Sequence, residues 1–157
     1  PAGSGPRHME FNADRTRLYS IAEISREVFV FQVRHGAMPR LELMQSVSVP
    51  EVTEGDGGDI HMHPDGRWLY ASQRNGDDGI AVFEVRADGT LKRTGYCRTD
   101  LHPRHFAVSP DGGSLLVACK NSNSIQVLSI DRETGLLSDT GHRVTFPSDS
   151  PVCILFR

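Results

Sequence analysis

Short apolar runs recur along the whole chain, separated by turns that are rich in Gly, Asp, Asn and Pro. The segments Val28–Val33 and Ile80–Val85 are typical, because β-branched and aromatic residues favour strands. No stretch shows a convincing 3.6-residue apolar period, the signature of an amphipathic helix. The pattern therefore predicts an all-β protein.

The expected strands come in groups of four, and one short phrase recurs in each group. Its aligned residues are spaced about 51 and then about 46 positions apart, which is the period of propeller blades. The aligned pairs are Leu18-Tyr19, Leu69-Tyr70 and Leu115-Leu116. Four antiparallel strands at this period predict a β-propeller. A sandwich of about 13 strands would explain the strand count but not the recurring phrase.

We expect one domain, a partial β-propeller of about three four-stranded blades and one closing strand. The expected blades are about 5–58, 59–102 and 103–150, and the closing segment is 151–157. Propellers need roughly four to eight blades to close. The closing strand is therefore expected to complete a blade begun elsewhere, in a missing N-terminal half of a seven-bladed ring.

Composition narrows the class of protein. Hydrophobic residues make up 38% of the chain and the formal net charge is -3, with Lys and Arg dispersed, so neither nucleic acid nor a membrane surface is an expected partner. No apolar run approaches the roughly 20 residues that span a bilayer. Cys97, Cys119 and Cys153 are far apart and odd in number, which favours reduced thiols and a cytoplasmic location.

Charged residues recur at equivalent positions of the repeats. Arg7 aligns with Arg104 and His8 aligns with His105, whereas Glu23 aligns with two cations, Arg74 and Lys120. In a propeller these positions open on one end of the ring, opposite the Pro-Asp-Gly turns, which backbone geometry alone explains. A ring of Arg and His with a carboxylate suits a small anionic substrate, and Glu or His can move a proton.

The motifs resemble the lactonase family of seven-bladed propellers, which includes bacterial propeller-type 6-phosphogluconolactonases and the carboxy-cis,cis-muconate cyclase. The resemblance runs nearly end to end and covers about the C-terminal half of such a protein. It is carried by Gly5-Pro6-Arg7-His8, Glu23, Asp59-Ile60-His61, Ser72-Gln73-Arg74, Pro103-Arg104-His105-Phe106 and Pro151-Val152-Cys153.

The resemblance implies a metal-free enzyme without cofactor that hydrolyses 6-phosphogluconolactone in the pentose phosphate route. Glu23, with His8 or His105, is expected to activate water, and Arg7, Arg74, Arg104 and His61 are expected to bind the substrate. Ala22 and Gln73 depart from the family, which has Asn before the Glu and the Arg.

Two other functions stay open on the same fold. One is cycloisomerisation of a muconate, which uses the same cationic ring. The other is a non-catalytic or truncated propeller that serves as a binding platform, with the chain inactive as a fragment.

Several residues have simpler interpretations. Arg7 and Arg104 are also consistent with packing between blades, and Lys120 with a solvated charge. Only one of His61 and His63 can face the channel, and we expect His61. The remaining candidates are interpreted as surface loop residues: His35, His102 and His142.

The histidines lack the spacing of a helical metal site, so no metal is expected. Residues 50–58 are expected to form a long acidic loop, with a lid as the alternative.

Overall fold

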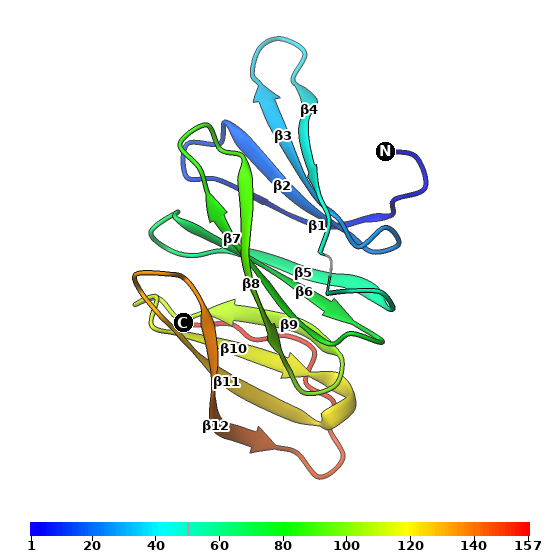
Figure 1. Ribbon diagram of the computed structural model, residues 1–157, viewed down its shortest axis with the longest axis vertical. Helices are drawn as coiled ribbons and strands as arrows, with labels where there is room; N and C mark the ends of the chain where they lie inside the picture. Colours follow the sequence, from blue (N-terminus) through cyan, green and yellow to red (C-terminus); the bar gives the residue numbers. More distant parts are fainter. Residues whose placement is uncertain (50) are drawn as a thin grey trace.

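The computed structural model describes residues 1–49 and 51–157 and contains three four-stranded antiparallel sheets, stacked one on another (Figure 1). The first contains β1 (Pro6–Phe11), β2 (Arg17–Ala22), β3 (Val28–Arg34) and β4 (Arg40–Val47). The second contains β5 (Asp56–Met62), β6 (Trp68–Arg74), β7 (Gly79–Val85) and β8 (Leu91–Arg98). The third contains β9 (Pro103–Val108), β10 (Ser114–Cys119), β11 (Ser124–Ile130) and β12 (Leu137–Thr145).

Within each sheet the strands are neighbours in sequence order, as expected for a propeller blade. The predicted all-β fold is therefore confirmed. A sandwich is excluded, since three successive four-stranded sheets are stacked in series rather than two sheets facing each other (Figure 1).

Two apolar clusters hold the blades together. The first joins blades 1 and 2 through side chains such as Tyr19, Ile60 and Phe83. The second joins blades 2 and 3 and includes Tyr70 and Phe106, both fully buried. Blade 2 is therefore covered on both faces, which explains why β6 is buried along its whole length and β7 over its first five residues.

Equivalent tyrosines add a hydrogen bond across each interface. Tyr19 donates to the Gly89 carbonyl oxygen at 3.0 Å, and Tyr70 donates to the Gly135 carbonyl oxygen at 3.1 Å. Each bond joins the second strand of one blade to the outer hairpin of the next. The repeated phrase thus fixes the spacing between blades as well as the strands.

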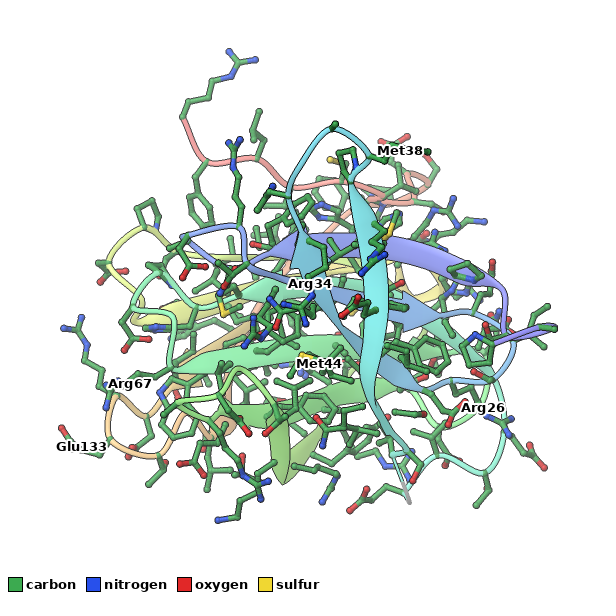
Figure 2. All side chains as sticks on the ribbon, turned by 90° about the horizontal axis from the view of Figure 1, so that it is seen from above. Arg26, Arg34, Met38, Met44, Arg67 and Glu133 are labelled. Carbon is green, nitrogen blue, oxygen red and sulfur yellow. The ribbon has the colours of Figure 1, made fainter. Side chains whose placement is uncertain are left out.

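The stack has two distinct ends. At the mouth end the first strand of each blade begins opposite the end of the second, with the pairs Pro6–Ala22, Asp56–Arg74 and Pro103–Cys119. The turn end carries the tight turns between those strands. Figure 2 shows Arg67 and Glu133 at the turn end and Arg26, which follows β2, at the opposite end.

Two predicted segments differ from the structure. The expected loop 50–58 is shorter, because β5 already begins at Asp56, which pairs with Arg74 across the sheet. Pro50, the first residue of that loop, lies outside the described residues. The residues that directly follow β10 also differ, since Lys120–Ser122 form a single 3-10 turn that the sequence pattern did not indicate.

Residues 146–157 form no strand in the described structure. The backbone N–H of Ile154 instead donates to His105 Nδ1 at 3.2 Å, so this segment lies against β9. Pairing of residues 151–157 with a strand outside the chain stays a prediction. Over the described ranges 1–49 and 51–157, no helix has the length and apolar character needed to cross a membrane.

Candidate active site

Glu23 lies between guanidinium groups of two blades at the mouth end. Arg74, the last residue of β6, donates from Nη2 to Glu23 Oε1, and Arg7 Nε lies 3.9 Å from the same oxygen. Arg7 also donates from Nη1 to the Gly58 carbonyl oxygen at 2.7 Å. Burial, and then the nearby Arg74 charge, lower the pKa of Arg7. We call Arg7, Glu23 and Arg74 the ionic triplet.

Arg74 is held from its other side by His102. Its side chain is 6% exposed, and Nη1 donates to His102 Nε2 at 3.2 Å. The expectation that His102 is a surface residue is wrong, because it is only 8% exposed, in the loop that enters β9. Its carbonyl oxygen accepts the Lys120 N–H at 2.9 Å, which fixes that loop. Burial, followed by the charge of Arg74, lowers the pKa of His102 and keeps the ring a neutral acceptor.

Gly57 allows the two blades to approach at the triplet. Its N–H donates to the Glu23 carbonyl oxygen at 2.9 Å, and a Cβ at this position would lie 2.2 Å from the Ala22 carbonyl oxygen. Gln73, which stands where the family has Asn, donates to the Arg26 carbonyl oxygen at 3.1 Å. Both contacts join blade 2 to the turn that follows β2, so they fix the distance between Glu23 and Arg74.

A second cluster surrounds Asp59, whose side chain is 1% exposed. His8 donates from Nδ1 to Asp59 Oδ1, while Asp59 Oδ2 accepts from His61 Nε2 at 3.0 Å. His105 Nε2 is 3.6 Å from the same Oδ2. His61 Nδ1 is in turn 2.9 Å from Glu10 Oε2. We call Asp59, the three histidines and Glu10 the carboxylate hub. Each of the three blades contributes one imidazole to the Asp59 carboxylate.

Backbone groups complete the environment of Asp59. Ile60 N–H donates to Oδ1 at 3.0 Å, and Phe106 N–H donates to Oδ2 at 3.3 Å. The Asp59 N–H itself donates to the Ser72 hydroxyl at 2.7 Å. A buried carboxylate with this many donors is stable in its charged form.

The pKa values follow from this geometry. Burial raises the pKa of Asp59, but hydrogen bonds from His61 and His8 outweigh it and hold that pKa well below the usual 3.8. Burial lowers the pKa of His61, yet its bonds to Asp59 and then to Glu10 raise it to about 9. Burial lowers the pKa of His105. His61 is therefore an imidazolium held between two carboxylates, Asp59 and Glu10.

The hub raises the question of a metal, because ligand atoms of Asp59, His61 and His105 all lie within 4.8 Å of one another. The imidazole nitrogens that face Asp59, however, are hydrogen-bond donors, whereas a metal ligand must be unprotonated. His105 Nδ1 accepts the Ile154 N–H, so a neutral ring carries its proton on Nε2, which faces Asp59. His61 is protonated on both nitrogens. This arrangement fits a hydrogen-bonded cluster, and we assign no metal to it.

A further cation, Arg104, lies near the triplet. Arg104 is half-buried, and its charge contributes to the lowered pKa values of Arg7 and His102. Among residues 1–49 and 51–157, the Arg104 guanidinium has no hydrogen-bond or ion-pair partner. Its guanidinium is therefore available to an anion at the mouth end.

Sequence reasoning placed Arg7, Glu23 and Arg74 at one opening, and the structure brings these three together. It did not include Glu10, Asp59 or His102 among the site residues. A usable signal existed in the repeat itself. Partners in the bonds between adjacent blades are 51 positions apart: Arg7 with Gly58, His8 with Asp59, Glu10 with His61, and Glu23 with Arg74.

Comparisons with a family model and with curated proteins point to the same family. A family model described as "Lactonase, 7-bladed beta-propeller" matches residues 1–156. A 6-phosphogluconolactonase of Formosa agariphila is 38% identical over 138 residues, which are 86% of this chain and 39% of that protein. One from Pectobacterium carotovorum is 36% identical and covers 85% of this chain and 41% of that protein.

Solved structures agree. A candidate 6-phosphogluconolactonase from Bacteroides fragilis superposes with a TM-score of 0.89 at 43% identity, over 96% of this chain and 41% of that chain. A periplasmic gluconolactonase from Pseudomonas aeruginosa gives a TM-score of 0.89 at 34% identity, over 98% and 42%. The chain thus spans about two fifths of the length of these relatives. With a family match over nearly its whole length, the chain belongs to the lactonase family of seven-bladed β-propellers.

Proposed function

We propose that this chain contributes the active site of a lactonase that hydrolyses 6-phosphogluconolactone to 6-phosphogluconate. The observation that carries the proposal is the ionic triplet, in which a carboxylate is held between guanidinium groups of two adjacent blades at the mouth end. The names of the Formosa and Pectobacterium proteins supply the substrate. The Pseudomonas protein is named for a lactone without the phosphate, and that lactone is the alternative substrate.

Glu23 is the best candidate for the group that activates water. Its Oε1 accepts from Arg74, whereas no described residue in 1–49 or 51–157 donates a hydrogen bond to Oε2. His8 Nε2 already accepts from Arg7, and His105 Nδ1 accepts from the Ile154 backbone. Of the three residues expected to move a proton, Glu23 alone therefore keeps a proton-accepting atom without a partner within the described chain.

In the proposed mechanism Glu23 Oε2 takes a proton from water as the water oxygen bonds to the lactone carbonyl carbon. The carbonyl oxygen becomes an oxyanion, which a guanidinium stabilises. As the intermediate collapses, the ring C–O bond breaks and the ring oxygen receives the proton back from Glu23. Arg7 and Arg104 bind the two anionic groups, the phosphate and the developing oxyanion, and Arg74 orients Glu23.

We propose for His61 a different role from the expected binding of substrate. Both of its ring nitrogens are engaged, one by Asp59 and the other by Glu10, so neither is free to bind a substrate. We assign it to charge balance within the carboxylate hub.

A coupled assay tests the proposal. The lactone is generated in place, the 6-phosphogluconate formed is oxidised with NADP, and the spontaneous rate is subtracted. We expect turnover above that background when the chain is co-expressed with the N-terminal blades of a relative such as the Formosa protein. The chain alone is the second sample, and it tests whether these blades are a required partner. Gluconolactone without phosphate is the third. If neither lactone is hydrolysed faster than its spontaneous rate, the proposal is refuted.

We also propose that the protein is cytoplasmic. Cys97, Cys119 and Cys153 are free thiols, as in proteins of a reducing compartment, and this supports the cytoplasm. The alternative is the periplasm, the location named for the Pseudomonas relative.

A further inference from the structure

The carboxylate hub places a buried charge cluster next to the ionic triplet. Asp59 is 1% exposed and is surrounded by imidazoles from β1, β5 and β9. Buried ion pairs are on average weak contributors to stability. Groups with strongly shifted pKa values occur often at functional sites. The hub is therefore a candidate for a role in the chemistry at the mouth end.

One hydrogen-bond chain connects the two clusters. Arg7 is only a donor, so its Nη1, 3.1 Å from His8 Nε2, must donate to that nitrogen. His8 Nε2 then carries no proton, and the proton of the ring lies on Nδ1, where it is donated to Asp59 Oδ1. Arg7 Nη1 gives its second proton to the Gly58 carbonyl oxygen, at 2.7 Å. The order of donation is Arg7 to His8 to Asp59.

We propose that Asp59 and His8 are positioning residues that aim the Arg7 guanidinium at the anionic group of the substrate. Asp59 selects the His8 tautomer that leaves Nε2 free to accept, and His8 then holds Arg7. The opposite tautomer would place an N–H of His8 against an N–H of Arg7 and release the guanidinium. The nature of the substrate rests on the proposed function, whereas the hydrogen-bond chain does not.

Glu10 and His61 explain why Asp59 stays charged and fixed. His61 donates to Asp59 Oδ2 from its Nε2 and binds Glu10 with its other nitrogen. Asp59 is thereby held at Oδ2 by a cation and presents Oδ1 to His8. An Asn at position 59 would turn its amide oxygen to the stronger donor, His61, and its NH₂ group to His8. We therefore expect Asp59→Asn to convert His8 to the Nε2–H tautomer.

The tautomer is measured directly by ¹⁵N–¹H correlation spectra of the seven histidines in the labelled chain. We expect His8 in the wild type to be protonated on Nδ1 alone, and in Asp59→Asn on Nε2. Asp65→Asn is the matched control, because Asp65 also contacts a histidine, His63, at 2.7 Å but at the turn end. That control should leave the His8 signals in place.

Kinetics separate positioning from catalysis. His8 is 43% exposed, so its replacement should not prevent folding even if Asp59→Asn does. We expect His8→Leu to raise KM about tenfold or more with little change in kcat, because Arg7 loses its acceptor. His8→Gln supplies an amide oxygen to Arg7 and should restore most of the affinity. Where turnover is absent, the dissociation constant of 6-phosphogluconate replaces KM.

Specific results would overturn the proposal. A wild-type His8 protonated on Nε2, or a His8 tautomer that Asp59→Asn leaves unchanged, would break the hydrogen-bond chain. If His8→Leu and His8→Gln both lowered kcat strongly, His8 would act as a proton acceptor and not as a positioning residue. Absence of lactone hydrolysis with an intact tautomer pattern would instead count against the proposed function alone.

Discussion

The turn end and the mouth end of the blade stack both carry aspartates, but their partners differ. At the turn end, Asp65 accepts the Arg67 backbone N–H at 2.9 Å and Asp111 accepts the Gly113 N–H at 3.2 Å, in each case only two residues away. At the mouth end, Asp59 is bound by His8, 51 residues earlier, and by the Phe106 N–H, 47 residues later.

The difference separates two uses of one residue type. A turn aspartate satisfies backbone groups of its own turn, and each blade does this independently. Asp59 and Glu23 instead bind groups from neighbouring blades, so their geometry exists only when the blades are stacked. Substitutions at the mouth end should therefore change activity, whereas comparable substitutions at the turn end should change stability at most.

The largest expected effect is on turnover. We expect Glu23→Gln to lower kcat about 1,000-fold, because the amide cannot take the proton of water while the guanidinium groups still bind the phosphate. The coupled assay measures it. Glu42→Gln is the matched control, since Glu42 also pairs with two arginines, Arg34 and Arg40, on the outer strand β4. An unchanged kcat in Glu23→Gln would remove Glu23 from the mechanism.

The next effect is on stability at the contact between blades 1 and 2. Gly57→Ala would place a Cβ 2.2 Å from the Ala22 carbonyl oxygen, and backbone cannot yield as a side chain can. We expect a loss of about 3 kcal/mol in the free energy of unfolding, measured with urea.

Gly113→Ala at the turn end is the control for this substitution. Its Cβ would meet only side-chain atoms of Asp111 and Arg132, at 3.0 and 3.5 Å, and these can move. Equal losses in the two variants would show that the close approach at Gly57 is not what limits packing between the blades.

The comparison also explains how much the sequence could predict. The strands and their grouping follow from local features, such as the Pro64-Asp65-Gly66 turn, whose Gly66 has φ +74°. Arg7, Glu23 and Arg74 could be placed at one end because Arg7 lies at the start of a first strand, whereas Glu23 and Arg74 lie at the ends of second strands, and both positions are opposite the tight turns.

Contacts across blades were harder to predict. Asp59 lies in the motif Asp59-Ile60-His61, which separates it from the turn aspartates, but Asp59 and Glu10 become site residues only through partners in another blade. His102 does lie in a loop, but its burial and its hydrogen bond to Arg74 are tertiary features that the local sequence does not indicate. The predicted start of β5 was too late because Gly57 is a weak strand former. Glycine is needed at this position because the backbone of blade 1 approaches it closely.

A third prediction concerns pH. The pKa of His61 is raised from 6.5 to about 9, so its stabilising effect is complete below pH 6.5 and is lost as the pH rises through about 9. The groups that face it are Glu10 on β1, Asp59 on β5 and His105 on β9. Because the side chain is partly exposed, we expect a loss on the order of 2 kcal/mol over this range.

Urea unfolding at several pH values measures this loss. His61→Gln should flatten the dependence between pH 6.5 and 9, because no imidazolium then remains between the two carboxylates. His63→Gln is the control at the turn end, where His63 lies 3.0 Å from the Gly112 carbonyl oxygen, and it should keep the slope. A slope that survives in His61→Gln would place its origin outside the hub.

The smallest effect tests a bond between blades that has no part in the site. Tyr70→Phe removes the 3.1 Å hydrogen bond to the Gly135 carbonyl oxygen at the turn end and leaves that buried oxygen without its donor. We expect a loss of about 1 kcal/mol in unfolding free energy and no change in kcat. Tyr19→Phe removes the equivalent bond to Gly89 one blade earlier, so a similar loss is expected. A fall in kcat in either variant would mean that the spacing between blades is transmitted along the strands to the ionic triplet, and the two ends would then not be independent.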